Sequence, residues 1–138
     1  MNPIHLDATA SEAMNSQHLF GPFFCGASWD TWRAVVKAAH AEPLTKDELT
    51  LFKAVAGRLP PLQRIRELVA AVGRGGGKDS AVSFLAAYHQ AVTFDPKGKL
   101  RPGERAYVLC IAVDKAQAAI AFRYVAGYFE AIPALAGM

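Results

Sequence analysis

Glycines and a lysine gather in one short segment, and their order suits the binding of phosphate groups. The segment reads Gly73-Arg74-Gly75-Gly76-Gly77-Lys78-Asp79-Ser80. Glycines permit the positive φ angles that turn several backbone amides inward, and without side chains they let a polyphosphate come close. The start of a following helix adds free amides and a partial positive charge, and Lys78 would reach the β- and γ-phosphates. The segment therefore predicts a nucleotide-binding loop.

The metal ligand of such a loop is a hydroxyl group just inside the helix. Here three residues, instead of the usual four, separate Gly73 from Gly77, and Asp79 stands between Lys78 and Ser80. One helix position turns a side chain by about 100°, so Ser80 needs a local adjustment to reach the usual place. We predict Mg²⁺ bound by Asp79 or Ser80, and Asp79 also suits the plain role of a carboxylate at a helix N-terminus.

Two other interpretations of the glycine loop stay open. A glycine-rich turn can join a strand to a helix without binding any ligand. A dinucleotide-binding turn fits less well, because Lys78 stands where the last glycine of that fingerprint belongs. Its acidic residue would have to be Asp114, which lies too far along the chain.

The loop needs a strand before it and a helix after it, and the apolar pattern predicts both. The compact apolar run 68–72 suits a buried strand. From Lys78 onward apolar residues recur at helical spacing, until Asp95-Pro96 ends the pattern. The order of strand, glycine loop and helix follows from these signals.

A second strand and a second helix are predicted after a polar connection. The apolar run 106–113 suits a buried strand, in which Cys110 is expected to be a buried free thiol. Asp114 with Gln117 indicates a capping box, and the helix that it opens must stop by Pro133. Two strands with their helices predict an α/β fold with a partial parallel βαβα unit.

The N-terminal part predicts only helices. Residues 1–19 show no sustained periodicity and are expected to form a loose leader. Apolar residues at helical spacing predict a helix over 29–41. A further helix is predicted over 46–56, because Thr45 and Glu48 have the spacing of a capping box.

Composition and charge set wider limits. With 138 residues, 52% hydrophobic and 20% charged, the chain has the size and make-up of one folded domain, which excludes a wholly disordered protein. A formal net charge of +3 is too small to indicate nucleic-acid binding by itself. The sequence shows neither the start of a secretory signal nor an apolar run of membrane-helix length, so we expect a soluble, cytoplasmic protein.

Three stretches resemble the front part of the ATPase domain of phage terminase large subunits, the motors that package viral DNA. One is the shortened glycine loop, with arginine directly after its first glycine, which is similar to the variant phosphate-binding (Walker A) loop of that family. The other two lie before and after this loop: Leu19-Phe20-Gly21-Pro22-Phe23-Phe24 with Ser28-Trp29-Asp30-Thr31-Trp32-Arg33, and Ala112-Val113-Asp114-Lys115-Ala116-Gln117-Ala118 with Phe122-Arg123-Tyr124. The likeness covers about residues 19–138.

The resemblance implies a P-loop ATPase with ATP and Mg²⁺ as ligands, and a phosphate-sensing or charge-stabilising role for Arg74. It divides the chain into a leader and helical lead-in over 1–62 and a partial ATPase domain over 63–138. It also implies the partners of a packaging motor: the rest of the large subunit or neighbouring copies, the terminase small subunit, the portal and double-stranded DNA.

The chain stops before the acidic pair that binds magnesium and activates water in that family, and before its nuclease domain. We therefore expect a fragment that binds nucleotide but does not hydrolyse it alone. Two alternatives stay open: a small binding or scaffold module in which the glycine loop only turns the chain, and a fragment of another P-loop ATPase.

Overall fold

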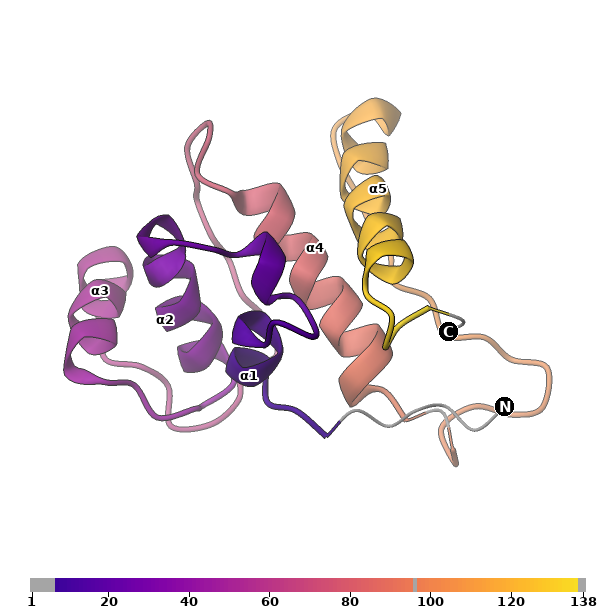
Figure 1. Cartoon of the computed structure of the whole chain (residues 1–138), viewed down its shortest axis with the longest axis horizontal. Helices are drawn as coiled ribbons and strands as arrows, with labels where there is room; N and C mark the ends of the chain where they lie inside the picture. The colour runs from indigo at the N-terminus through magenta and orange to yellow at the C-terminus, as the bar shows by residue number, and fades with distance from the viewer. Residues whose placement is uncertain (1–6, 96, 137–138) are drawn as a thin grey trace. The chain divides into compact units, whose positions relative to one another are not determined.

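The computed structural model describes residues 7–95 and 97–136, and every regular element in this part of the chain is helical (Figure 1). The chain divides into two compact units. One unit is Thr9–Arg74, and the other contains Ala8 together with the chain from Gly75 onward. The α-helices are α1 (Ala10–Asn15), α2 (Asp30–Ala39), α3 (Lys46–Ala56), α4 (Lys78–Tyr88) and α5 (Lys115–Ala131).

The predicted α/β fold is wrong, because the described residues contain no strand and therefore no parallel βαβα unit. The runs 68–72 and 106–113, which were predicted as buried strands, have no regular structure. Their side chains are largely exposed, with Val69 84% and Ile111 83% accessible. An apolar run becomes a strand only when a second strand takes up its backbone hydrogen bonds, and no such strand is present in the part described.

Helix α1 begins at a capping box in the segment that was predicted to be a loose leader. Thr9 Oγ1 accepts a hydrogen bond from the Glu12 amide at 3.2 Å, and the Glu12 carboxylate accepts one from the Thr9 amide at 2.8 Å. Ala13 and Met14 of this helix are buried. The prediction of an unstructured leader over 1–19 is therefore wrong for Ala10–Asn15, while residues 1–6 lie outside the described part.

Helices α2 and α3 pack against each other in the first unit (Figure 1). Their contact centres on Ala34, Ala38 and Phe52, which are buried, and two small residues facing an aromatic ring let the helix backbones come close. The helices predicted over 29–41 and 46–56 are both confirmed. The chain then turns at Gly57, whose left-handed φ of 63° favours glycine.

The cap of α3 offers a direct test of how local signals stabilise this unit. Thr45 Oγ1 accepts a hydrogen bond from the Glu48 amide at 3.3 Å. Thr45→Ala leaves this amide without its acceptor, so we expect the free energy of unfolding of the unit to fall by about 1 kcal/mol. Urea unfolding followed by circular dichroism measures the loss. Thr50→Ala, an exposed threonine inside the same helix, should cost nothing comparable, and an equal loss would contradict the capping role.

An ion pair between α2 and α3 makes this unit sensitive to acid. Lys37 Nζ lies 2.8 Å from Glu48 Oε1, and both side chains are about four-fifths buried. Burial by itself raises the pKa of Glu48, but hydrogen bonds from Lys37 and Thr45 and the charge of Lys37 outweigh it and hold the pKa below its ordinary value of 4.5. The carboxylate therefore contributes stability that is present above its unfolded pKa and is lost as the pH falls through its folded pKa.

We expect Glu48→Gln to be less stable than the unchanged chain at pH 7, and this difference to shrink as the pH falls towards about 3. Glutamine can still close the capping box, so the variant isolates the charge. Denaturant unfolding at both pH values measures the difference. Glu67→Gln, at an exposed position, serves as the control, and a Glu48→Gln deficit that stays constant with pH would contradict the ionic contribution.

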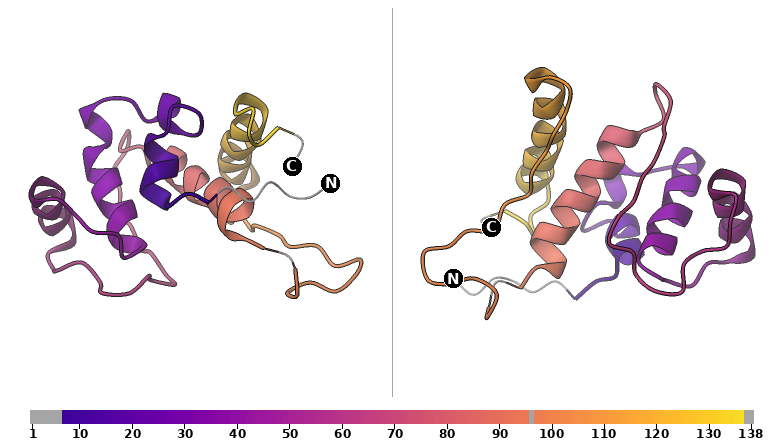
Figure 2. Two further views of the ribbon diagram at one scale, coloured as in Figure 1. Left: turned by 60° about the horizontal axis from the view of Figure 1, so that its bottom comes forward. Right: turned by 180° about the vertical axis from the view of Figure 1, so that it is seen from behind.

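Helices α4 and α5 form the second unit and lie side by side (Figures 1 and 2). Ser83 Oγ, inside the contact, donates a hydrogen bond to the Ala121 carbonyl at 3.2 Å, and Phe84 is fully buried. Both helices start where they were predicted, and Asp114 caps α5 by accepting a hydrogen bond from the Gln117 amide at 2.9 Å. No helix in the described part of the chain has the length and apolar character needed to cross a membrane.

Candidate functional site

The glycine loop leads directly into α4, and its backbone has the conformation that glycines were expected to supply. Gly75 has φ 78°, and Gly77, the N-cap of α4, has φ 74°, so both lie in the left-handed region. Apart from its two chain neighbours, no atom of the described residues comes within 4 Å of the position that a Cβ atom on Gly75 would take. The space beside Gly75 is therefore open and leaves room for a ligand just before α4.

The boundary between the two units falls inside the predicted loop, between Arg74 and Gly75. Gly73 and Arg74, both exposed, belong to the first unit, and the candidate site in the second unit consists of residues 75–80. The buried strand that was predicted ahead of the loop is absent. Of the predicted strand, loop and helix, only the loop and the helix are therefore present.

The start of α4 differs from the starts of three other helices because no side chain caps it. Thr9, Thr45 and Asp114 cap α1, α3 and α5 with side-chain oxygens, whereas the N-cap of α4 is Gly77. A helix of eleven residues has amides at its first turn that need acceptors, together with a partial positive charge. Without an oxygen from its own cap, this end of α4 suits an anion.

Lys78 is the first residue of α4, and its side chain is exposed. Asp79 is exposed as well, and Ser80 is half-buried. The lysine therefore stands beside the open glycines, where a flexible ammonium group can reach an anion held by the loop. Residues 75–78, which were predicted to contact phosphate groups, therefore lie together at the start of α4.

The predicted magnesium ligands Asp79 and Ser80 are neighbours in the first turn of α4. Among the described residues, no three His, Cys, Asp or Glu side chains come together as a metal site. Magnesium in nucleotide sites needs only one or two protein ligands, because phosphate oxygens and water complete its shell. One carboxylate or one hydroxyl suits that role, and adjacent helical residues point about 100° apart, so the choice between the two stays a prediction.

Tyr128 of α5 contacts the first turn of α4. This contact was not predicted from the sequence. The Tyr128 hydroxyl donates a hydrogen bond to the Ser80 carbonyl at 3.3 Å, and the tyrosine side chain is buried. Burial, with a smaller contribution from Tyr124, raises the pKa of Tyr128 to about 12, so this hydroxyl keeps its proton at neutral pH. The only sequence signal was the four-residue spacing of Tyr124 and Tyr128, which places both on one side of a helix.

Comparisons of the chain with protein-family models, with curated proteins and with solved structures give no match.

Proposed function

We propose that this chain binds ATP with Mg²⁺ through the glycine loop and the start of α4, as the N-terminal part of a phage terminase large subunit. One observation carries the binding proposal: two glycines in the left-handed region open the uncapped start of α4, and exposed Lys78 follows at once. Amides, helix dipole and a mobile cation thereby converge where a polyphosphate would lie.

Each group has a separate part in binding. The loop amides and the first turn of α4 hold phosphate oxygens by hydrogen bonds, and Lys78 neutralises charge on the β- and γ-phosphates. Asp79 or Ser80 would hold Mg²⁺, which would supply positive charge against the phosphate groups. Tyr128 keeps the first turn in place through the Ser80 carbonyl. None of these residues activates water, so the proposed role is binding.

The terminase part of the proposal is supported by the three stretches of sequence that resemble that family. It names the rest of the large subunit, the small subunit, the portal and double-stranded DNA as partners. Its test is the coding sequence downstream of Met138, which should encode an apolar run ending in Asp-Glu and then widely spaced aspartates. A downstream sequence without these features would contradict the terminase assignment and leave nucleotide binding to be tested alone.

Thermal unfolding with different ligands tests nucleotide binding. We expect ATP and inorganic triphosphate, each with Mg²⁺, to raise the melting temperature, and adenosine to leave it unchanged, because the site is built for phosphate. A ligand that binds only the folded chain adds about 2.7 kcal/mol at about 100 times its Kd. If neither phosphate compound raises the melting temperature up to millimolar concentration, the proposal is wrong.

The alternative of a scaffold module is favoured by one observation, the break between the two units inside the loop. Gly75 and Gly77 would then serve only to turn the chain into α4. On that interpretation Gly75→Ala lowers stability, because alanine is strained at positive φ, and phosphate compounds have no effect. The ligand series therefore separates the two functions.

A further inference from the structure

The run 106–113 in the second unit is an apolar segment whose backbone forms no hydrogen bond with the other described residues. Its eight residues are Ala-Tyr-Val-Leu-Cys-Ile-Ala-Val, and no hydrogen bond joins them to any other segment in the described part of the chain. Most of the large side chains are exposed: Tyr107 84%, Leu109 79%, Ile111 83% and Val113 96%. Figure 2 shows this coil running beside α5 to the start of that helix.

Such a segment is a template for strand pairing. Tyrosine, valine and isoleucine favour extended backbone, and exposed amides and carbonyls are satisfied best by another strand. Asp114, which follows the run, already has extended backbone at φ −140° and ψ 165°. Pairing with a strand from another molecule would satisfy the backbone and cover apolar side chains in one step.

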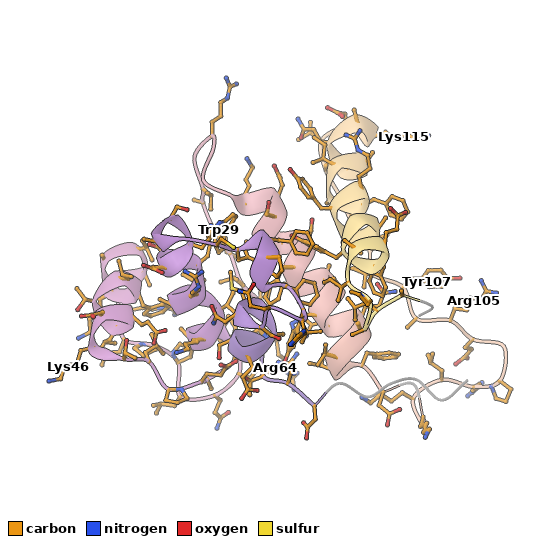
Figure 3. All side chains as sticks on the ribbon, viewed as in Figure 1. Trp29, Lys46, Arg64, Arg105, Tyr107 and Lys115 are labelled. Carbon is orange, nitrogen blue, oxygen red and sulfur yellow. The ribbon has the colours of Figure 1, made fainter. Side chains whose placement is uncertain are left out.

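The charges at the two ends of the run indicate which strand fits. Glu104 and Arg105 precede it, and Asp114 and Lys115 follow it. Figure 3 shows Arg105 and Lys115 at opposite ends of this coil, and all four charged side chains are exposed. At each end of the run a negative residue is therefore followed by a positive one. A second copy of the same segment that runs in the opposite direction has complementary charges at both ends.

We propose that a second copy of this chain pairs with this segment as an antiparallel strand, with Arg105 opposite Asp114 of the partner copy. In this register Glu104 lies opposite Lys115 of the partner copy, so each end carries two pairs of opposite charge. A shift of one residue one way sets Glu104 against the partner copy's Asp114. A shift the other way sets Arg105 against the partner copy's Lys115. In a parallel in-register pair, each charged residue would lie opposite the same residue of the partner copy, so that like charges meet at all four positions.

The register has a consequence for the assembly. Leu109 faces Cys110 of the partner copy, so the two copies use different residues at the centre and the contact has no two-fold symmetry. The free edge of each copy can accept a further copy, and contacts of this head-to-tail kind grow into open assemblies. The association is independent of nucleotide binding, because it uses no residue of the glycine loop.

Charge reversal tests the register on the full chain. We expect sedimentation velocity to show mass rising with concentration, and Glu104→Lys or Lys115→Glu alone to weaken association about tenfold, since each contact loses two attractive pairs. The double variant Glu104→Lys with Lys115→Glu should restore association. Lysine-to-glutamate at a helix start is compatible with α5, and circular dichroism checks that every variant stays folded. A monomeric unchanged chain, or a double variant no better than the single ones, would overturn the proposal.

Cross-linking provides a second, independent test. With both native cysteines replaced by alanine, Val108→Cys and Ile111→Cys chains should form a disulfide when they are mixed and oxidised, because these positions face each other across the contact. Neither variant alone should cross-link efficiently. In the unchanged chain, rapid formation of a Cys110–Cys110 disulfide would place the two cysteines opposite each other, a symmetric register that contradicts this one.

Discussion

Replacing Lys78 by alanine should remove most of the stabilisation that ATP gives the chain. If the ammonium group supplies enough of the binding energy for its loss to weaken ATP about 100-fold, the ligand contribution falls from about 2.7 kcal/mol to below about 0.5 kcal/mol at the same ATP concentration. Without ligand the variant should unfold at nearly the same temperature, because Lys78 is exposed at the first position of α4. The melting temperature with and without ATP measures both effects.

The chain offers a matched control for this variant. Lys46 is the first residue of α3, as Lys78 is the first residue of α4, but Thr45 caps α3 and no glycine loop precedes it. Lys46→Ala should therefore keep the full ATP effect. If Lys78→Ala also keeps it, the phosphate groups bind elsewhere, and if both variants lose it, the effect depends on overall charge.

Phe84→Ala should destabilise the second unit by about 3–5 kcal/mol, the usual range for removing a buried phenylalanine ring. Phe84 is completely buried in α4, and its ring stacks on that of Tyr88 with centroids 5.9 Å apart. Alanine would lose the transfer free energy of the ring and leave a cavity where the ring is buried. The total free energy of unfolding of a small domain is of the same order as this loss. We therefore expect the second unit of the variant to be largely unfolded at 37 °C.

Chemical denaturation monitored by circular dichroism measures this loss. Phe122→Ala is the matched control, since Phe122 is a phenylalanine in α5 with 67% of its surface exposed. Its replacement should change the free energy of unfolding by less than about 0.5 kcal/mol. A loss below about 1 kcal/mol for Phe84→Ala would show that the ring does not support the core of this unit.

Helix ends were the features that short sequence patterns predicted best. Thr45 with Glu48 set the start of α3, and Asp114 set the start of α5. The same Thr-x-x-Glu pattern stands at Thr9 and Glu12 and begins α1, whereas the prediction of a loose leader used only the lack of apolar periodicity over 1–19. Caps succeed because the donor and the acceptor lie within four residues of each other.

The predicted strands failed because an apolar run carries no information about its partner. The runs 68–72 and 106–113 have the composition of buried strands, yet each strand needs backbone hydrogen bonds from a segment far away in the chain. Cys110, expected to be a buried thiol, is only half-buried for the same reason. The hydrogen bond from Tyr128 to Ser80 likewise joins residues 48 positions apart and follows from no local pattern.

By itself, then, the sequence determined where α3, α4 and α5 begin and that flexible glycines lie directly before Lys78, because each of these depends on neighbours within about one helical turn. Only tertiary contacts could decide that the apolar runs form no strand within the described residues, that α5 contacts the first turn of α4, and that the chain divides between Arg74 and Gly75. These outcomes depend on contacts between segments distant in the sequence, whose free energy no short pattern records.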